Sequence, residues 1–150
     1  MEIRVAIFED NKLVRDALQA ILNGTPGYLC SGAFADGNRW EIDIKRSTPD
    51  VVLMDLRMPG KDGIEATKTI SKQYPQIKVL ILSMYEDERF VYHLMENGAN
   101  GYLLKNSEPN EIRRAIMEVF EKGYYLNNFV NRILLKKSHA RQKVIPSLNS

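Results

Sequence analysis

Three acidic side chains occupy positions where an expected β-strand ends. Glu9 and Asp10 follow the apolar run 3–8, and Asp55 follows the run 51–54. Short, β-branched-rich runs that alternate with helical stretches are typical of a parallel α/β sheet, in which ligands bind beyond the carboxyl ends of the strands. Carboxylates brought together there repel one another unless a cation or a proton intervenes. Mg²⁺ suits such a cluster, because it binds one or two carboxylates and keeps several waters.

Two further polar residues fall at the same edge of the sheet, Ser83 after the fourth expected strand and Lys105 after the fifth. Acids combined with one hydroxyl and one lysine are typical of a site for a phosphoryl group. One carboxylate is the nucleophile, the metal neutralises the transferring oxygens, and the other two groups bind the remaining ones. Each residue also has a simpler interpretation: Ser83 as a loop hydroxyl, Lys105 as a surface lysine, and Asp10 as the cap of a helix starting at Asn11.

Five repeats of a strand followed by a helix would position these residues. This alternation predicts an α/β fold, a doubly wound five-stranded parallel sheet of the (βα)5 flavodoxin-like type with strand order 2-1-3-4-5 and helices on both faces. The first and third strands are then neighbours, so we expect Glu9, Asp10 and Asp55 to share one pocket. The expected strands are 3–8, 28–34, 51–55, 78–82 and 101–104, and the expected helices are 11–23, 37–46, 64–74, 86–97 and 108–121.

The length and composition are those of a single globular domain. A chain of 150 residues can bury about 70% of the surface that its unfolded form exposes. It contains no apolar run of ~18 residues and no signal-peptide pattern, so we expect no membrane span. The single cysteine, Cys30, lies in an expected strand and is interpreted as an inert core thiol. One cysteine allows no disulfide within the chain, which agrees with a reducing cytoplasm.

Charge is distributed unevenly along the chain. Residues 1–121 hold all 19 acidic residues and 15 basic ones, whereas residues 122–150 hold six basic residues and no acidic one. A basic end can mark a nucleic-acid or partner surface, although a solvated helix and linker explain it more simply. We expect one more helix near 127–138 and an aperiodic tail over 144–150. The predicted organisation is a globular domain over 1–122 and a basic linker helix and tail over 123–150, an ending typical of a fragment of a longer protein.

Five separated motifs then fall in order on the expected strand ends. Over about residues 3–122 the chain resembles a response-regulator receiver domain of two-component signalling. The residues around Asp55 and Lys105 are similar to the LuxR/NarL-type subfamily, whose receivers precede a helix-turn-helix. The motifs are Glu9-Asp10, the stretch Leu53-Met54-Asp55-Leu56-Arg57-Met58-Pro59-Gly60, the stretch Asp62-Gly63-Ile64-Glu65-Ala66, Ser83, and the stretch Gly101-Tyr102-Leu103-Leu104-Lys105.

The resemblance implies a phosphoryl acceptor and a metal site. Asp55 would accept the phosphoryl group from a histidine kinase and form an acyl phosphate. Asp10 would bind Mg²⁺ directly and Glu9 largely through water. Asp55 and the backbone carbonyl of Arg57 would complete the protein ligands, and Lys105 would pair with the phosphoryl oxygens.

The resemblance also implies a conformational switch. Ser83 would move to hydrogen-bond the phosphoryl group, and Tyr102 would follow from an exposed to a buried position. The surface of the fourth helix, fifth strand and fifth helix would change with it. Receivers commonly have alanine directly after the Ser83 position, whereas this chain has Met84 and Tyr85. We expect these bulky residues to slow self-dephosphorylation.

The resulting function is that of a signalling domain rather than an enzyme, with only self-catalysed phosphoryl acceptance and hydrolysis. The implied partners are a histidine kinase, a second copy of the chain after phosphorylation, and DNA through a missing C-terminal domain only. The dimer could form through helices one and five or through the fourth helix to fifth helix face. Alternatives are a stand-alone receiver that shuttles phosphoryl groups or binds a partner, a receiver that no longer phosphorylates, and a haloacid-dehalogenase-like phosphatase. Members of that last family carry the motif Asp-x-Asp at the nucleophile, and this chain has Arg57 at the position of the second Asp.

Overall fold

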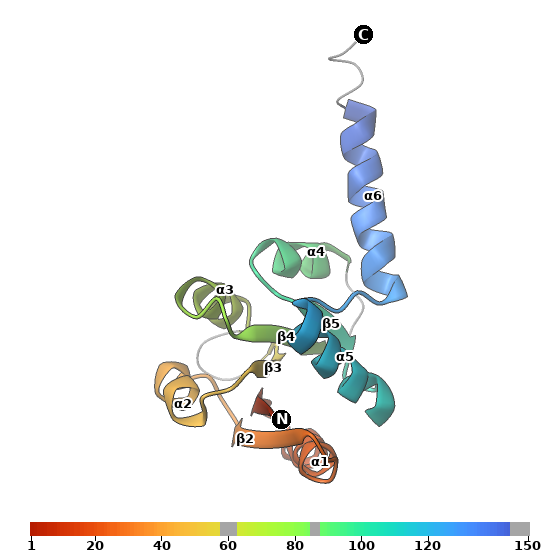
Figure 1. Cartoon of the computed structure of the whole chain (residues 1–150). Helices are drawn as coiled ribbons and strands as arrows, with labels where there is room; N and C mark the ends of the chain where they lie inside the picture. The colour runs from red at the N-terminus through yellow and green to blue at the C-terminus, as the bar shows by residue number, and fades with distance from the viewer. Residues whose placement is uncertain (58–62, 85–87, 145–150) are drawn as a thin grey trace.

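Five parallel strands form one sheet with the order β2-β1-β3-β4-β5 (Figure 1), as the strand–helix alternation predicts. The computed structural model describes residues 1–57, 63–84 and 88–144, apart from the side chains of residues 90 and 140–144. The strands are β1 Ile3–Phe8, β2 Tyr28–Phe34, β3 Val51–Asp55, β4 Lys78–Ser83 and β5 Gly101–Leu104, and the helices are α1 Lys12–Asn23, α2 Trp40–Ser47, α3 Gly63–Gln73, α4 Glu88–Glu96, α5 Pro109–Lys122 and α6 Asn128–Val144.

The helices cover both faces of the sheet and enclose two apolar cores. α1 and α5 pack on one face, and α2, α3, α4 and the first half of α6 pack on the other. Strand β3 is buried at every position and β1 at all but one. Strands buried on both faces must be apolar throughout, which explains why these two runs lack the alternation of a half-exposed strand.

The register of the sheet brings the strand ends together. In the β1–β3 pair, Ile7 lies beside Leu53 and Phe8 beside Met54. The residues that follow these partners, Glu9 and Asp55, therefore leave neighbouring strands at the same edge. The parallel arrangement thus converts a separation of 46 positions in sequence into spatial proximity.

The helices begin one to three residues from their expected starts, and hydrogen bonds explain two of these differences. α1 begins at Lys12, because the side chain of Asn11 accepts a hydrogen bond of 3.1 Å from the backbone N–H of Val14 and so caps the helix. The interpretation of Asp10 as this cap is therefore wrong. α2 begins at Trp40 rather than at 37, since the segment before it forms a turn in which Asp36 accepts a hydrogen bond from the backbone of Asn38.

The cysteine environment also differs from expectation. Cys30 lies on β2, the edge strand of the sheet, where every residue is only partly buried. Partial burial raises the pKa of the Cys30 thiol above its ordinary value. The thiol is therefore half-buried and packs against the edge of the apolar core instead of lying fully inside it, and its raised pKa agrees with the expected inert thiol.

Helix α6 begins as part of the core and then extends away from it (Figure 1). The side chain of Asn127 caps it by accepting a hydrogen bond of 2.9 Å from the backbone of Val130. Val130 and Ile133 are buried in the same apolar core as α4, whereas residues 135–139 are exposed. Only the second half therefore has the solvated character expected of a linker. No helix within the described ranges is both long and apolar enough to cross a membrane.

Two expected features fall outside the described residues. Most of the Pro-Gly turn at 59–63 lies in 58–62, and the expected start of the fourth helix at 86 lies in 85–87. Tyr85 belongs to the second of these segments. Its effect on dephosphorylation stays a prediction.

Candidate functional site

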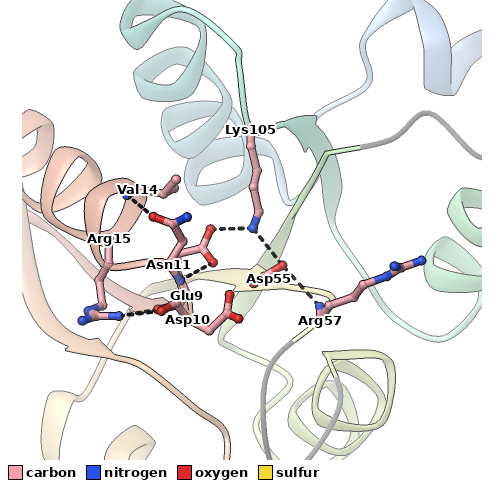
Figure 2. A network of polar contacts seen from close by, with 8 residues as sticks. All are labelled: Glu9, Asp10, Asn11, Val14, Arg15, Asp55, Arg57 and Lys105. Atoms are coloured by element: carbon pink, nitrogen blue, oxygen red, sulfur yellow. Dashed lines mark hydrogen bonds and ion pairs between the residues drawn. The ribbon is translucent and has the colours of Figure 1, made fainter.

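Three carboxylates meet at the carboxyl edge of the sheet, as their positions after the strands predict. Each of Glu9, Asp10 and Asp55 offers an oxygen, and these oxygens all lie within 4.8 Å of one another. Glu9 and Asp55 are buried, at 0% and 3% exposure, while Asp10 is exposed. The cluster thus combines two buried carboxylates with one exposed carboxylate, and Figure 2 shows all three side chains.

Lys105 reaches this cluster from the end of β5. Its Nζ lies 2.6 Å from Glu9 Oε1 and 3.2 Å from Asp55 Oδ1. Figure 2 shows the ammonium group between the two carboxylates. Three carboxylates and one ammonium leave two net negative charges when all are ionised, so a divalent cation would balance the group.

The proximity of the acids changes their protonation. Burial, followed by the hydrogen-bonding contact and charge of Glu9, raises the pKa of Asp55 from 3.8 to about 7. Burial acts to raise the pKa of Asp10 as well, but contacts with Asp55 and Glu9 and the charge of Lys105 together lower it. Burial acts to lower the pKa of Lys105, and the two buried carboxylates outweigh it and raise the pKa. With its pKa raised to about 7, the Asp55 carboxyl of the metal-free cluster is protonated in a large fraction of the molecules at neutral pH, and a cation would displace that proton.

One oxygen of Asp55 is left without a hydrogen bond. Oδ1 accepts a hydrogen bond of 3.2 Å from the backbone N–H of Arg57 and lies near Lys105. Oδ2 is buried and accepts no hydrogen bond from the residues that the structure describes. A buried carboxylate oxygen normally has a partner, because losing its hydration is unfavourable. The carboxylate donor set and its net charge fit Mg²⁺, which prefers oxygen ligands.

Gly63 makes room for the backbone that carries Asp55. A Cβ atom at this position would lie 2.4 Å from the carbonyl oxygen of Asp55 and 2.8 Å from Leu56 Cα. The backbone N–H of Gly63 donates to the carbonyl of Leu56 at 3.1 Å, and Thr67 Oγ1 donates to the carbonyl of Gly63 at 2.6 Å. The start of α3 is thus fixed directly against the Asp55 loop, and only glycine allows this approach.

Ser83 ends β4 beside the cluster, and Tyr102 lies within the adjacent strand β5. Ser83 is 8% exposed, and its carbonyl accepts a hydrogen bond of 2.8 Å from the backbone N–H of Lys105. Tyr102 is 2% exposed, its ring lies 6.1 Å from that of Phe129, and its carbonyl accepts a hydrogen bond of 3.1 Å from Asn127. The structure therefore has Tyr102 in a buried position, covered by the start of α6. Its movement with Ser83 stays a prediction.

Sequence reasoning assigned no role to two residues that hold the acidic loop. The backbone N–H of Asn11 donates to Glu9 Oε2 at 3.3 Å, and the guanidinium of Arg15 donates to the carbonyl oxygens of Glu9 and Asp10. Residues four positions apart at the start of a helix lie on one face, so the spacing of Asn11 and Arg15 is a signal that they can lie near the same loop. It did not indicate that the arginine turns back toward the loop.

Met84, expected to shield the site, is 69% exposed, so most of its side chain faces solvent.

The sequence matches the model of a known protein family. The family model for the response regulator receiver domain matches residues 5–117. This range contains every residue of the cluster and extends to the last part of α5.

The chain is also similar to longer bacterial regulators. It is 35% identical over 136 residues to the transcriptional regulatory protein DegU of Brevibacillus brevis, covering 91% of this chain and 58% of the relative. It is 35% identical over 139 residues to the oxygen regulatory protein NreC of Staphylococcus haemolyticus, covering 86% of this chain and 64% of the relative. The chain therefore spans about three fifths of the length of these relatives.

Solved structures match the fold over most of the chain. A LuxR-family two-component response regulator from Aurantimonas superposes with a TM-score of 0.81 at 29% identity, covering 92% of this chain and 99% of that one. The signal receiver domain of the response regulator NarL from Mycobacterium tuberculosis superposes with a TM-score of 0.76 at 31% identity, covering 80% and 97%.

Proposed function

The chain belongs to the response regulator receiver family, in its LuxR/NarL-type branch, and from this we propose that Asp55 accepts a phosphoryl group from a histidine kinase. Domains of this family act as signalling modules of two-component systems. The observation that carries the proposal is the buried Asp55 Oδ2, which has no hydrogen-bond partner among the described residues and lies in an acidic cluster with Lys105. It is the oxygen best placed to act as a nucleophile.

The proposed reaction is an in-line transfer onto this oxygen. Asp55 Oδ2 forms a bond to phosphorus while the bond from phosphorus to the imidazole nitrogen of the donor histidine breaks. The donor reacts with its other ring nitrogen protonated, so the P–N electron pair stays on the ring and the products are an aspartyl phosphate and a neutral histidine. Glu9, Asp10, Asp55 and the Arg57 carbonyl would hold Mg²⁺, which when bound neutralises the charge on the transferring oxygens.

Lys105 would keep the nucleophile ionised and then pair with the phosphoryl oxygens. The lysine contacts Asp55 Oδ1, which leaves Oδ2 for the incoming group. An ionised carboxylate is required for attack, and the pKa of Asp55 near 7 without metal means that a cation in the cluster would favour the reactive form. Phosphoryl acceptance and later hydrolysis would be catalysed by the chain itself.

Transmission of the signal is proposed to pass through Ser83 and Tyr102. Ser83 ends β4 beside the cluster, and Tyr102 lies on the adjacent strand. A hydrogen bond from Ser83 to the phosphoryl group would draw the end of β4 inward, and Tyr102 would adjust to the space it leaves. The α4–β5–α5 surface would then change its affinity for a partner.

The output of the complete protein is proposed to be transcriptional. The name of the DegU relative describes a transcriptional regulatory protein, and the chain covers only 58% of it. DNA would be bound by a further domain after phosphorylation and homodimerisation of the receiver, in the bacterial cytoplasm. A role as a stand-alone phosphoryl shuttle or partner-binding module is the alternative.

Intact mass after incubation with acetyl phosphate and Mg²⁺ tests the acceptance step. We expect one phosphoryl adduct on the natural chain. It should be lost in the Asp55→Asn variant and without Mg²⁺, and retained in an Asp16→Asn variant, whose carboxylate lies on the exposed side of α1. An adduct that survives Asp55→Asn would contradict the assignment of the acceptor. Turnover of a phosphate ester well beyond one equivalent would instead indicate a phosphatase.

A further inference from the structure

One residue, Arg15, donates hydrogen bonds to three consecutive backbone carbonyls. Its Nη1 lies 2.8 Å from the carbonyl oxygen of Glu9 and 3.3 Å from that of Asp10. Its backbone N–H donates to the carbonyl of Asn11 at 2.9 Å. Figure 2 shows the guanidinium turning back from the first turn of α1 to the loop that carries two of the three acids.

The remaining contacts fix this loop from other sides. The backbone N–H of Glu9 donates to the carbonyl of Phe34 at 2.9 Å, and that of Asn11 donates to Glu9 Oε2 at 3.3 Å. These bonds hold the N–H groups of the loop and the Glu9 side chain. The carbonyl groups of Glu9 and Asp10 take their side-chain hydrogen bonds from Arg15. The direction of the exposed Asp10 carboxylate therefore depends on the backbone that Arg15 holds as well as on its contacts with Asp55 and Glu9.

We propose that Arg15 is a positioning residue for Mg²⁺ binding. Its guanidinium bridges the carbonyls of Glu9 and Asp10 and so fixes the direction in which the Asp10 side chain leaves the loop. The inference rests on the proposed function, because it assigns Mg²⁺ to the cluster. Residues that hold metal ligands in place typically contribute tenfold to a hundredfold in metal affinity. A loop carbonyl freed from Arg15 can turn to water, and the Asp10 carboxylate then samples directions that do not face Glu9 and Asp55.

The direction of the change in Mg²⁺ affinity when Arg15 is removed distinguishes a positioning role from an effect of its positive charge. A positive charge near a cation site opposes cation binding, so its removal by electrostatics alone would strengthen Mg²⁺ binding. Loss of a positioning contact would weaken it. Arg15→Met removes both the charge and the donors while keeping an unbranched side chain, and the two explanations predict opposite changes in affinity.

Arg4 provides a matched control at the other end of β1. Its Nε donates to the carbonyl of Thr48 at 3.0 Å and its Nη2 to the carbonyl of Ser47 at 2.9 Å. It thus also bridges two consecutive carbonyls. Five strand positions separate Arg4 from Glu9, roughly 17 Å at about 3.3 Å per residue. Arg4→Met removes the same kind of contact without touching the acidic loop.

The experiment is urea unfolding at a series of Mg²⁺ concentrations, which yields the dissociation constant from the gain in stability and separately the stability without metal. We expect the natural chain and Arg4→Met to bind Mg²⁺ equally, Arg15→Met about tenfold more weakly, and Arg15→Lys about threefold more weakly, because the shorter ammonium side chain reaches the carbonyls less well. Affinity in Arg15→Met equal to or tighter than that of the natural chain overturns the proposal. Should Arg15→Met fail to fold, native affinity in Arg15→Lys overturns it instead.

The outcomes distinguish the positioning role from the function on which it rests. A natural chain that gains no stability from Mg²⁺ contradicts both proposals. A natural chain that is stabilised by Mg²⁺, together with an Arg15→Met variant stabilised to the same degree, contradicts the positioning role alone.

Discussion

Replacement of Asp55 by asparagine should stabilise the metal-free protein, and the gain should grow with pH. The carboxyl is 3% exposed and its pKa is raised from 3.8 to about 7, first by burial and then by Glu9. A carboxyl whose pKa is higher in the folded state binds its proton more tightly there. Its ionisation therefore opposes folding, and the natural chain loses stability as pH rises from about 4 to about 7.

The expected gain in stability follows from the size of the pKa shift of Asp55. A rise in pKa from 3.8 to about 7 corresponds to a destabilisation of about 4 kcal/mol above pH 8, at about 1.4 kcal/mol per pH unit. The Asp55→Asn variant carries no charge at this position, so it should be more stable than the natural chain by about 2–4 kcal/mol at pH 8 and by less than ~0.5 kcal/mol near pH 4. Saturating Mg²⁺ should reduce the difference at pH 8, because the natural chain has the complete set of carboxylates.

The assay is urea unfolding in the presence of a chelator at pH 4, 6 and 8, followed by the fluorescence of Trp40, the single tryptophan, which is 4% exposed. Asp16→Asn is the matched control, because its carboxylate is exposed and pairs with Lys12 on α1, and it should leave stability nearly unchanged at all three pH values. A gain from Asp55→Asn that is the same at all three pH values, or a loss at pH 8, would refute the reasoning that burial of this charge opposes folding.

Three further substitutions test the positioning of the site and the packing of α6. Gly63→Ala places a Cβ against the backbone that carries the acceptor; it should lower stability by about 1–3 kcal/mol and slow phosphoryl acceptance measured by intact mass, and unchanged values of both would contradict the steric argument. Lys105→Gln leaves two buried carboxylates without their ammonium partner. The free energy of unfolding at pH 8 should fall by about 3 kcal/mol, and the loss should be smaller at pH 5 because the cluster takes up protons. A loss that does not depend on pH would argue against an ion-pair role. Val130→Ala should cost about 2 kcal/mol because the side chain is fully buried, whereas Leu135→Ala, at 58% exposure, should change stability by less than ~0.5 kcal/mol; equal effects would show that α6 does not pack as a half-buried helix.

The architecture of the site could be predicted from sequence because it depends on patterns along single strands. Apolar runs end at Glu9 and Asp55, and parallel strands place their carboxyl ends at one edge, so the meeting of the acids follows once strands β1 and β3 are neighbours. Lys105 could be included for the same reason. The strand order itself came from the regularity of parallel α/β folds.

Other features could not be predicted because they depend on contacts between distant side chains and backbone. The return of Arg15 to the loop carbonyls has no periodic signal, since any exposed arginine in a first helical turn has the same pattern. Tyr102 is covered by Phe129 and Asn127, which lie about 25 positions later in a segment that composition alone describes as a linker. The half-buried state of Cys30 follows from β2 being an edge strand, which a single strand pattern does not reveal.

The central claim is that Asp55 is the residue that becomes phosphorylated. Borohydride reduces an aspartyl phosphate to homoserine, so treatment of the natural chain after incubation with acetyl phosphate and Mg²⁺, followed by peptide mass spectrometry, reports the modified position directly. The account predicts homoserine at position 55 and at no other aspartate. Homoserine at Asp10 or elsewhere, or an adduct that borohydride does not convert, would contradict it.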